Sequence, residues 1–395
     1  MTEPSTAGAA KPRTEPSTAG AAKPRHAAAP GSSRGRRRLV AVVGVLVVAV
    51  LGTVTVLKVL ERRYEGAVQR QDLLGPVVHA SIAPDPLRVT GPLTFLLIGS
   101  DSRAGDNANP DTPDGTVAAI KGQRSDVIML LHVPKSTDRA YVISIPRDAY
   151  LPIADRNGDP AGRNKINAAF AFGGAPRLVQ TLNNYTGGRI DYPIIVDFSA
   201  IRTLTDLVGG VDVVVDRTSY DPYRFLPANT PYPVTPCEDT RGRSQRCVTF
   251  KAGTLHLDGQ LAEYYVRQRE GLPAGDFDRM KRQQQYLRAL LTKATSGDTI
   301  ANPVKFDKLV RTALGALTVD TRMPVSSLVF SLKGLRPGNL TFLSLPIADT
   351  TTIPGVGWVA VPDAAGAREL FTALNTDTLD QYVARHPTND VSHGA

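Results

Sequence analysis

Short apolar segments alternate with amphipathic segments over most of the chain. The apolar segments are partly β-branched and are bounded by turn residues, which is typical of buried strands. They cover 93–99, 127–133, 140–145, 194–198, 211–215 and 340–345. The amphipathic segments follow the helical period and cover 175–184, 199–207, 261–266, 276–294, 324–332 and 363–374. This alternation predicts one α/β domain over 91–386, with helices on both faces of a central sheet.

The spacing of two apolar segments indicates that the sheet is mixed. Residues 127–133 and 140–145 are only six residues apart, which permits a hairpin but no helical crossover. Antiparallel neighbours are therefore expected within the sheet.

One longer apolar stretch, Leu39–Leu57, has no charged residue. At about 1.5 Å per residue it just spans a bilayer core of about 30 Å. A cleaved signal peptide would have a shorter apolar core that ends in small residues. The stretch predicts an uncleaved signal-anchor in the cell membrane, and a multi-span transporter is excluded. A cytoplasmic N-terminus and an extracytoplasmic part over 58–395 follow from the arginines before the span, Arg34, Arg36, Arg37 and Arg38.

The segments outside the domain are predicted to lack a core. Residues 1–38 contain the repeat TEPSTAGAAKPR twice and have no aromatic residue, so they are read as a disordered basic cytoplasmic tail. Residues 58–90 are expected to connect the span to the domain, and 387–395 to form a flexible C-terminus.

Most of the net positive charge lies in the N-terminal tail, residues 1–38. The tail carries eight Lys or Arg and two Glu (8 − 2 = +6), so only +3 of the total of +9 remains for the other residues. The basic cluster is explained by its place beside the membrane, and specific recognition of nucleic acid is not expected.

Cys237 and Cys247 are the only cysteines. In an oxidising compartment they are predicted to form a disulfide that closes a surface loop, since no His or further Cys stands nearby to complete a zinc site.

Several catalytic motifs are excluded. There is no Walker A sequence, no G-x-G-x-x-G after a strand and no H-E-x-x-H, and six scattered histidines make a His-ligated metal site improbable. The G-x-S-x-G match at Gly31–Gly35 lies in the tail with no strand before it, so it is attributed to chance.

Charged residues instead gather beside the predicted strands. They occur in GSDSR (Gly99–Arg103), in RSD (Arg124–Asp126), in IPRD (Ile145–Asp148) and in the stretch Val266–Gln285. Within the helix predicted over 276–294, Arg279, Arg282 and Gln283 share a face that is expected to point into a cleft, while the stripe with Met280 and Leu287 packs. Arginines with one or two carboxylates are suited to a diphosphate and Mg²⁺.

These segments resemble the LytR-CpsA-Psr (LCP) family of bacterial envelope proteins. The resemblance rests on FLLIGSDSR, RSDVIMLLHV, AYVISIPRDAYLPI, KINAAFAFGG, GGVDVVV, AGTLHLDGQLAEYYVRQR and GDFDRMKRQQQYLRALL, which follow in the family's order from about Leu93 to Ala384. It implies a single α-β-α LCP-type domain. It also implies a phosphotransferase that moves a glycopolymer from an undecaprenyl-diphosphate carrier to peptidoglycan or another envelope acceptor.

The resemblance also implies roles for individual residues. Asp101, Arg103, Asp126 and Arg147 match the catalytic positions. Binding of the diphosphate is expected from Arg103, Arg124, Arg147, Arg267, Arg269, Arg279, Arg282 and Gln283. Oxygen ligands for Mg²⁺, with Mn²⁺ as the alternative, are expected from Asp101, Ser125, Asp126 and Asp276. Ser125 is included because Val127 stands where the family often has a hydroxyl residue.

Two other functions use the same features. A polyprenyl-diphosphate diphosphatase would use water in place of the sugar hydroxyl at the same site. A non-catalytic membrane regulator or lipid-carrier binding protein would need no reaction there. An apolar slot for the lipid is expected among strand residues such as Leu96, Ile98, Ile128 and Leu130, which any core would also contain.

Overall fold

The computed structural model describes residues 64–76, 92–100, 125–136, 138–227, 229–238, 242–323 and 336–387. The chain divides into two compact units, Met1–Lys58 and Val59–Ala395, and every described residue belongs to the second. The predicted tail, the predicted membrane span and the helix predicted over 324–332 lie outside the described residues. Within the described ranges, no helix has the length and apolar character needed to cross a bilayer.

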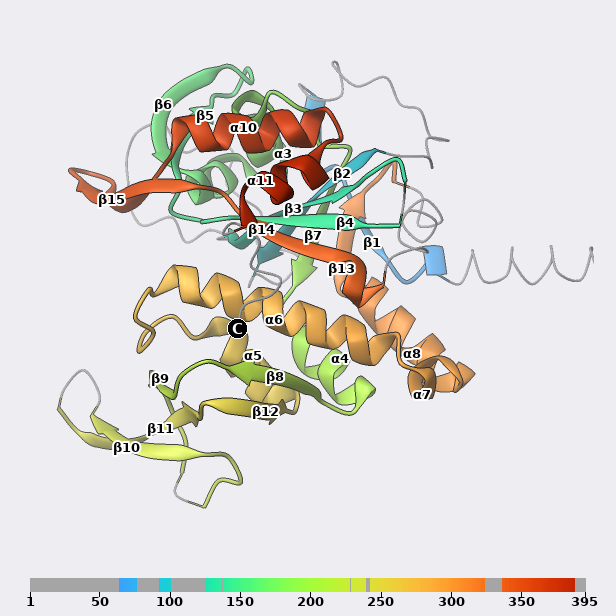
Figure 1. Cartoon of the computed structure of the whole chain (residues 1–395), viewed down its shortest axis with the longest axis vertical. Helices are drawn as coiled ribbons and strands as arrows, with labels where there is room; N and C mark the ends of the chain where they lie inside the picture. The colour runs from blue at the N-terminus through green and yellow to red at the C-terminus, as the bar shows by residue number, and fades with distance from the viewer. Residues whose placement is uncertain are drawn as a thin grey trace, which may run out of the picture. The chain divides into compact units, whose positions relative to one another are not determined.

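A seven-stranded mixed sheet forms the centre of the second unit, in the order β1-β13-β7-β2-β3-β4-β14 (Figure 1). Strand β3 pairs antiparallel with both β2 and β4, whereas β7 runs parallel to β2 and β14 runs parallel to β4. The predicted mixed sheet is confirmed. Its strands are β1 (Gln69–Gln71), β2 (Leu93–Ser100), β3 (Ser125–Val133), β4 (Ala140–Ile145), β7 (Tyr192–Asp197), β13 (Leu317–Asp320) and β14 (Leu340–Ser344).

One predicted strand lies outside this sheet. The segment over 211–215 is β8 (Val211–Val215), which pairs with β12 (Gly253–Leu257) in a separate two-stranded sheet. Its side chains alternate between buried and exposed, and Val214 is 54% exposed. The apolar run at 211–215 therefore predicted a strand correctly, but this strand is half-buried and does not belong to the main sheet.

The central strands separate two hydrophobic cores, because successive side chains of a strand leave opposite faces of the sheet. In β2, Leu96 and Ile98 join one core, whereas Leu93 and Phe95 join the other. The predicted lipid-slot residues Leu96, Ile98, Ile128 and Leu130 all lie in the first core and are at most 1% exposed. In this structure they are packed core positions.

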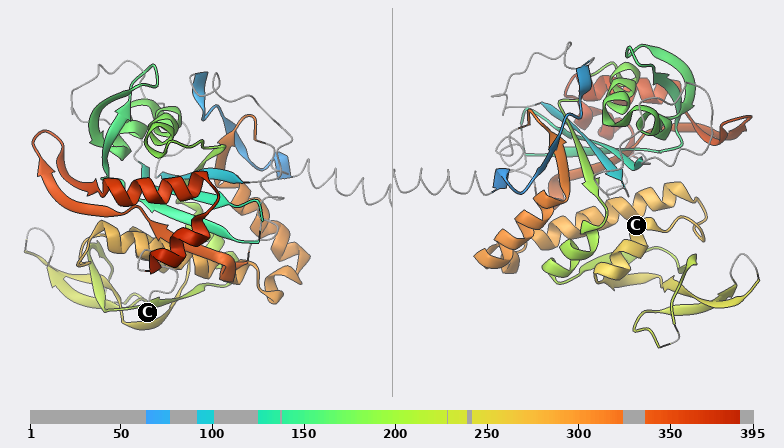
Figure 2. Two further views of the ribbon diagram at one scale, coloured as in Figure 1. Left: turned by 45° about the horizontal axis from the view of Figure 1, so that its top comes forward. Right: turned by 180° about the vertical axis from the view of Figure 1, so that it is seen from behind.

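Helices cover both faces of the sheet (Figure 2). One face is covered by α3 (Ile166–Thr186), α10 (Ala364–Asn375) and α11 (Leu379–Arg385). The other carries α6 (Asp276–Ala294) and α8 (Pro303–Gly315). A third core lies beyond α6 and includes residues of α4 (Ala200–Val208) and α5 (Gly259–Arg267). The remaining helices of the described ranges are α7 (Gly297–Ile300) and the short 3-10 helix η1 (Pro337–Asn339).

Helix α3 starts nine residues before the predicted boundary at Ala175. The difference comes from a kink, because Gly173 and Gly174 have non-helical backbone angles and Pro176 follows. Gly174 has φ 64°, a conformation that glycine adopts without strain. The sequence pattern therefore found the second part of α3 and missed the part before the kink.

Two hairpins and a three-stranded arm extend from this framework. The hairpins are β5 (Tyr150–Ala154) with β6 (Pro160–Lys165), and β15 (Ile347–Ile353) with β16 (Gly357–Pro362). The arm consists of β9 (Ser219–Phe225), β10 (Val234–Glu238) and β11 (Ser244–Phe250), in the order β10-β11-β9.

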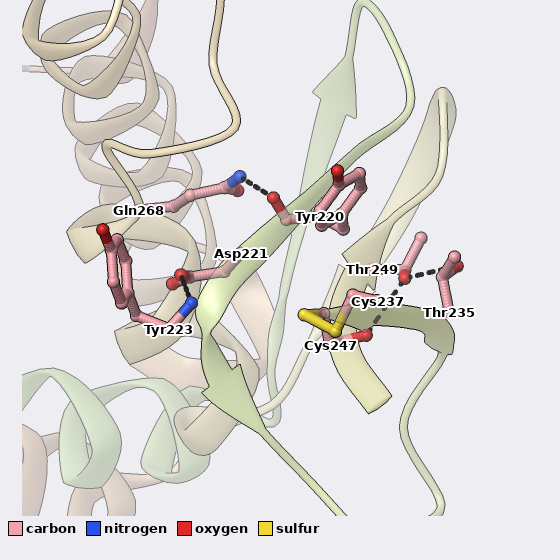
Figure 3. The surroundings of a disulfide bond; sticks show 8 residues. All are labelled: Tyr220, Asp221, Tyr223, Thr235, Cys237, Cys247, Thr249 and Gln268. Atoms are coloured by element: carbon pink, nitrogen blue, oxygen red, sulfur yellow. Dashed lines mark hydrogen bonds between the residues drawn. A yellow bond between two sulfur atoms is a disulfide. The ribbon is translucent and has the colours of Figure 1, made fainter. Parts of the chain in front are cut away.

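Cys237 and Cys247 form a disulfide within the arm (Figure 3). It joins two paired strands, β10 and β11, where the sequence suggested a loop. Cys247 is fully buried, so the bond holds the outer strand of the arm to its inner part.

Reduction of this disulfide is expected to lower the free energy of unfolding by about 2–3 kcal/mol, because a closed loop of this length restricts the unfolded chain. Urea denaturation with and without a reducing agent measures the difference. A Cys237→Ser/Cys247→Ser variant serves as the control, since the chain has no other cysteine and the variant should not respond to the reductant. Equal stabilities of the oxidised and reduced protein would contradict the expectation.

A buried histidine links the sheet to the turn between α10 and α11. His132, at 2% exposure, lies 3.1 Å from Thr94 Oγ1 through Nδ1 and 3.0 Å from Asp377 Oδ1 through Nε2. Asp377 also accepts a hydrogen bond from the Lys135 N–H, at 3.1 Å. Burial lowers the pKa of His132 although Asp377 opposes the shift.

Lowering the pH below about 6.5 is therefore expected to destabilise the fold, because the unfolded chain binds a proton at this histidine more readily than the folded chain does. The expected measurement is a free energy of unfolding that falls between neutral and mildly acidic pH. In His132→Gln, which keeps a polar side chain without a titrating group, this part of the pH dependence should disappear. An unchanged pH profile in the variant would show that other groups cause it.

Candidate functional site

The charged segments next to β2, β3 and β4 meet at one edge of the sheet. Gly99 pairs with Val127, and Ile128 pairs with Ile145, so the end of β2, the start of β3 and the end of β4 lie side by side. Asp101, Arg103 and Arg124 belong to these segments but lie outside the described residues. Asp126 and Arg147 are described and form an ion pair.

Arg147 is the centre of an ion-pair cluster. Besides Asp126, its Nε lies 3.6 Å from Asp148 Oδ2 and 3.5 Å from Asp276 Oδ1. Lys165 Nζ lies 2.9 Å from Asp148 Oδ1. Because Arg147 follows β4 and Asp276 begins α6, the cluster joins the sheet to the helix layer.

The first turn of α6 contributes Asp276 and Arg279, which form an ion pair at i and i+3. Both are buried. Burial raises the pKa of Asp276 against the effect of Arg279 and Arg147, and burial lowers the pKa of Arg279. The guanidinium groups of Arg147 and Arg279 are thus held within the protein by carboxylates.

The cluster is close to charge balance, with three cations (Lys165, Arg147, Arg279) and three carboxylates (Asp126, Asp148, Asp276). Its donors are not all used. The buried Nε atoms of Arg147 and Arg279 have no hydrogen-bond acceptor within the described part of the chain. Phosphate oxygens are suitable acceptors for such donors.

Arg282, one helical turn after Arg279, has a different environment. It is 5% exposed and makes no ion pair with any described carboxylate. Its guanidinium donates to Gln268 Oε1 and, at 2.7 Å, to Ser219 Oγ. It also lies 4.4 Å from the ring centre of Tyr265 and 5.1 Å from that of Phe250. Burial lowers its pKa, as expected for a cation held by neutral groups.

Gln268 connects Arg282 to the arm. Its Nε2 donates to Tyr220 O at 2.9 Å and to Glu270 O at 3.0 Å, and Figure 3 shows the bond to Tyr220. With Ser219 on β9 and Phe250 on β11, the disulfide-linked arm therefore forms one wall around Arg282. The sequence did not single out Gln268 or Ser219, because hydrogen bonds between distant segments leave no periodic signal.

The stripe of α6 with Met280 and Leu287 packs as predicted, since Met280 is buried and Leu287 packs against the second core. The face with Arg279, Arg282 and Gln283 is buried as well, which the sequence pattern did not predict. The reason is that α6 lies between two cores, since Tyr286 packs in the third core and Leu287 in the second. The Gln283 Nε2 donates to Val266 O at 3.2 Å, so this amide anchors α6 to α5.

The remaining predicted arginines lie at the end of α5 and just after it. Arg267 Nη1 is 2.8 Å from Glu263 Oε1, and Arg269 Nη2 is 2.6 Å from Glu270 Oε1. Arg269 is the more exposed, at 44% of its side chain, and lies close enough to Asp276 and Asp148 to influence them electrostatically. The structure thus places Arg269 beside the cluster and pairs Arg267 with α5.

The predicted metal ligands are only partly brought together. Ser125 and Asp126 are consecutive at the start of β3, where the register with β2 shifts, and Ser125 is fully buried. Asp276 lies between two arginines. No three His, Cys, Asp or Glu side chains group as a metal site among the described residues. Asp126, with 27% of its side chain exposed, is the predicted ligand that fits Mg²⁺, which binds proteins through one or two carboxylates and substrate phosphates.

The chain is similar to one family of proteins and to several of its relatives that are named for cell wall biosynthesis. The LytR_cpsA_psr family model matches residues 61–375. The chain is 34% identical over 285 residues to the Probable cell wall biosynthesis protein LcpB of Corynebacterium glutamicum, covering 72% of this chain and 61% of that protein. It is 30% identical over 260 residues to the Polyisoprenyl-teichoic acid–peptidoglycan teichoic acid transferase TagV of Bacillus subtilis, covering 65% of this chain and 61% of that protein.

The crystal structure of B. subtilis TagV has the same fold. It matches with a TM-score of 0.51 and 25% identity, covering 73% of this chain and 97% of that chain. The α/β architecture with a mixed central sheet is therefore shared. The matched region spans about three fifths of the length of the two curated relatives.

Proposed function

Since the chain belongs to the LytR_cpsA_psr family, we propose that it is a phosphotransferase that moves a glycopolymer from an undecaprenyl-diphosphate carrier to peptidoglycan or another envelope acceptor. Support comes from the relative TagV, which is named as a transferase of teichoic acid from a polyisoprenyl carrier to peptidoglycan. The relative LcpB, named as a probable cell wall biosynthesis protein, supports a role in the cell envelope.

The observation that carries the proposal is a set of three arginines, Arg147 just after β4 and Arg279 and Arg282 one turn apart on α6. Among the described residues, the buried Nε atoms of Arg147 and Arg279 have no hydrogen-bond acceptor, and the buried Arg282 pairs with no carboxylate. A diphosphate supplies acceptor oxygens for the two Nε donors and a negative charge for Arg282. Arg269 beside the cluster adds a further cation at a more exposed position.

The reaction requires little covalent chemistry from the protein. A sugar hydroxyl of the acceptor attacks the phosphorus that bears the glycan, the bond to the bridging oxygen breaks, and polyprenyl phosphate leaves. The arginines hold the diphosphate and stabilise the charge that develops on its oxygens. Asp101 and Asp126 are the carboxylates that would hold Mg²⁺, which would neutralise phosphate charge when bound. Whichever of Asp101 and Asp126 does not coordinate the cation would accept the hydroxyl proton.

We also propose that the chain is a single-pass membrane protein with residues 58–395 outside the cytoplasm. The uncharged stretch Leu39–Leu57 and the arginines before it support this orientation. The disulfide supports an oxidising compartment.

The test is a transfer assay with the purified full chain in detergent, Mg²⁺, a polyprenyl-diphosphate-linked saccharide and peptidoglycan fragments. Covalent attachment of the saccharide to the fragments, lost on chelation of Mg²⁺ and in an Arg267→Ala/Arg269→Ala variant, is the expected result. Release of phosphorylated saccharide without attachment would indicate the diphosphatase. Absence of any turnover, with the lipid still bound, would favour a carrier-binding protein.

A further inference from the structure

The hairpin of β15 and β16 carries the single tryptophan of the chain, Trp358. Its side chain is 42% exposed although the indole is the largest apolar group of the protein. The ring is held in place from one side, because it forms an edge-to-face contact with Phe277 at 6.4 Å between ring centres. Trp358 is thus an exposed aromatic ring with a defined position.

Three contacts place this ring beside the ion-pair cluster. Phe277 directly follows Asp276 in α6. The Ala360 N–H donates to Asp148 O at 3.0 Å, and Ala360 bridges to Ala149. The hairpin is therefore attached to the backbone that carries Arg147 and Asp148, and Figure 1 shows β15 extending from the body near β5 and β6.

The hairpin around Trp358 is polar and carries no cation of its own, and the neighbouring Lys165, which lies close to Gly357, is paired with Asp148. Thr352 lies directly opposite Trp358 in the register of the hairpin, and Thr350 follows on the same face of β15. Both threonines are exposed, and no Lys or Arg occurs between Ile347 and Pro362. An aromatic ring beside hydroxyl groups is suited to a sugar, whose C–H face packs on the ring while its hydroxyls form hydrogen bonds.

We propose that Trp358, with Thr350 and Thr352, binds a neutral hexopyranose ring of the acceptor glycan next to the diphosphate site. The identification of this glycan as the acceptor rests on the proposed function. The absence of cations on the hairpin disfavours a phosphate-bearing chain, and its attachment beside Asp148 explains why a saccharide held there lies close to the reacting phosphorus. The hairpin is then a specificity element for the acceptor, distinct from the arginines that bind the donor.

The sole tryptophan provides a direct assay that needs no turnover. The full chain in a detergent without sugar groups is titrated with a β-1,4-linked N-acetylglucosamine oligosaccharide while the tryptophan emission is recorded. We expect a saturable change in emission. Binding of the same oligosaccharide, measured by calorimetry, should weaken about tenfold in Trp358→Ala and much less in Trp358→Phe, which keeps an aromatic ring.

Phe306→Ala is the matched control, since Phe306 is an exposed aromatic residue of α8, at 39%, outside the hairpin. This variant should bind the oligosaccharide as the wild type does. In the transfer assay, Trp358→Ala should raise the KM for the acceptor and leave the KM for the lipid-linked donor unchanged.

Different outcomes separate this inference from the proposed function. Saturable binding that depends on Trp358 in a chain without transfer activity would support the saccharide site and contradict the transferase. Transfer activity with no effect of Trp358→Ala on the acceptor KM would overturn the saccharide site alone. An emission change with a polyanion or a peptide, but not with the neutral oligosaccharide, would also overturn it.

Discussion

Replacing Arg147 by alanine is expected to lower the rate of glycopolymer transfer at least about 100-fold, because one preorganised donor at a developing negative charge contributes this much in other enzymes. Arg147 contacts Asp126, Asp148 and Asp276, so its loss also leaves three carboxylates without their common cation. Their mutual repulsion and their negative charge disfavour a diphosphate at the same place. The measurement is kcat/KM in the transfer assay.

Two variants control this experiment. Arg147→Lys keeps the charge but loses the planar fork, so its activity should lie between those of the wild type and Arg147→Ala. Arg311→Ala removes an arginine that is 48% exposed and paired with Asp307 on α8, and it should leave transfer unchanged. Wild-type rates in Arg147→Ala, with the protein folded, would show that the cluster is only structural.

Replacing Arg282 by methionine is expected to have opposite effects on binding and on stability. Affinity for a diphosphate should fall at least about tenfold, because a hydrogen bond to a charged group contributes about 1.5–3 kcal/mol. The free energy of unfolding should be unchanged or higher. A buried cation without a carboxylate partner costs several kcal/mol in desolvation, whereas methionine packs well against Tyr265 and Phe250.

The same helix offers a matched control. Arg288 also lies over an aromatic ring, that of Phe342 at 5.2 Å, and donates to Leu340 O at 3.1 Å, but it is outside the site. Arg288→Met should reduce stability slightly and leave diphosphate binding unchanged. Chemical denaturation and titration with a soluble diphosphate measure both quantities. A large loss of stability in Arg282→Met with unchanged affinity would show that Arg282 is a structural residue.

Part of the site can be predicted from where the charged residues stand relative to the strands in the sequence. In the sequence, Asp126 stands at the start of one predicted strand and Arg147 just after the next, and antiparallel neighbours bring the start of one strand to the end of the next. The ion pair between these residues shows that they meet. The pattern of strands does not place Arg279 near them, since α6 follows more than a hundred residues later; the resemblance implied its role, and the tertiary structure gives its contact with Asp276.

Local patterns determine local structure in this protein. The apolar runs identified five of the seven strands of the main sheet and missed the short β1 and β13, and the prediction for α6 has the observed bounds. These signals are strong because burial of one face requires an apolar residue at every second position of a strand and at every third to fourth position of a helix. The motifs also carried the family resemblance, which the family model confirms over 61–375.

Only the tertiary structure decided which charges are paired and which are not. In the sequence Arg267, Arg279 and Arg282 look alike, yet the first pairs with Glu263, the second with Asp276, and the third contacts Gln268 and two aromatic rings. It likewise brought Trp358 to Phe277 beside the cluster. Long-range contacts depend on how distant segments pack, and a guanidinium's charge carries no information about its eventual partner. Periodicity therefore predicts the framework, and three-dimensional packing alone assigns the partners.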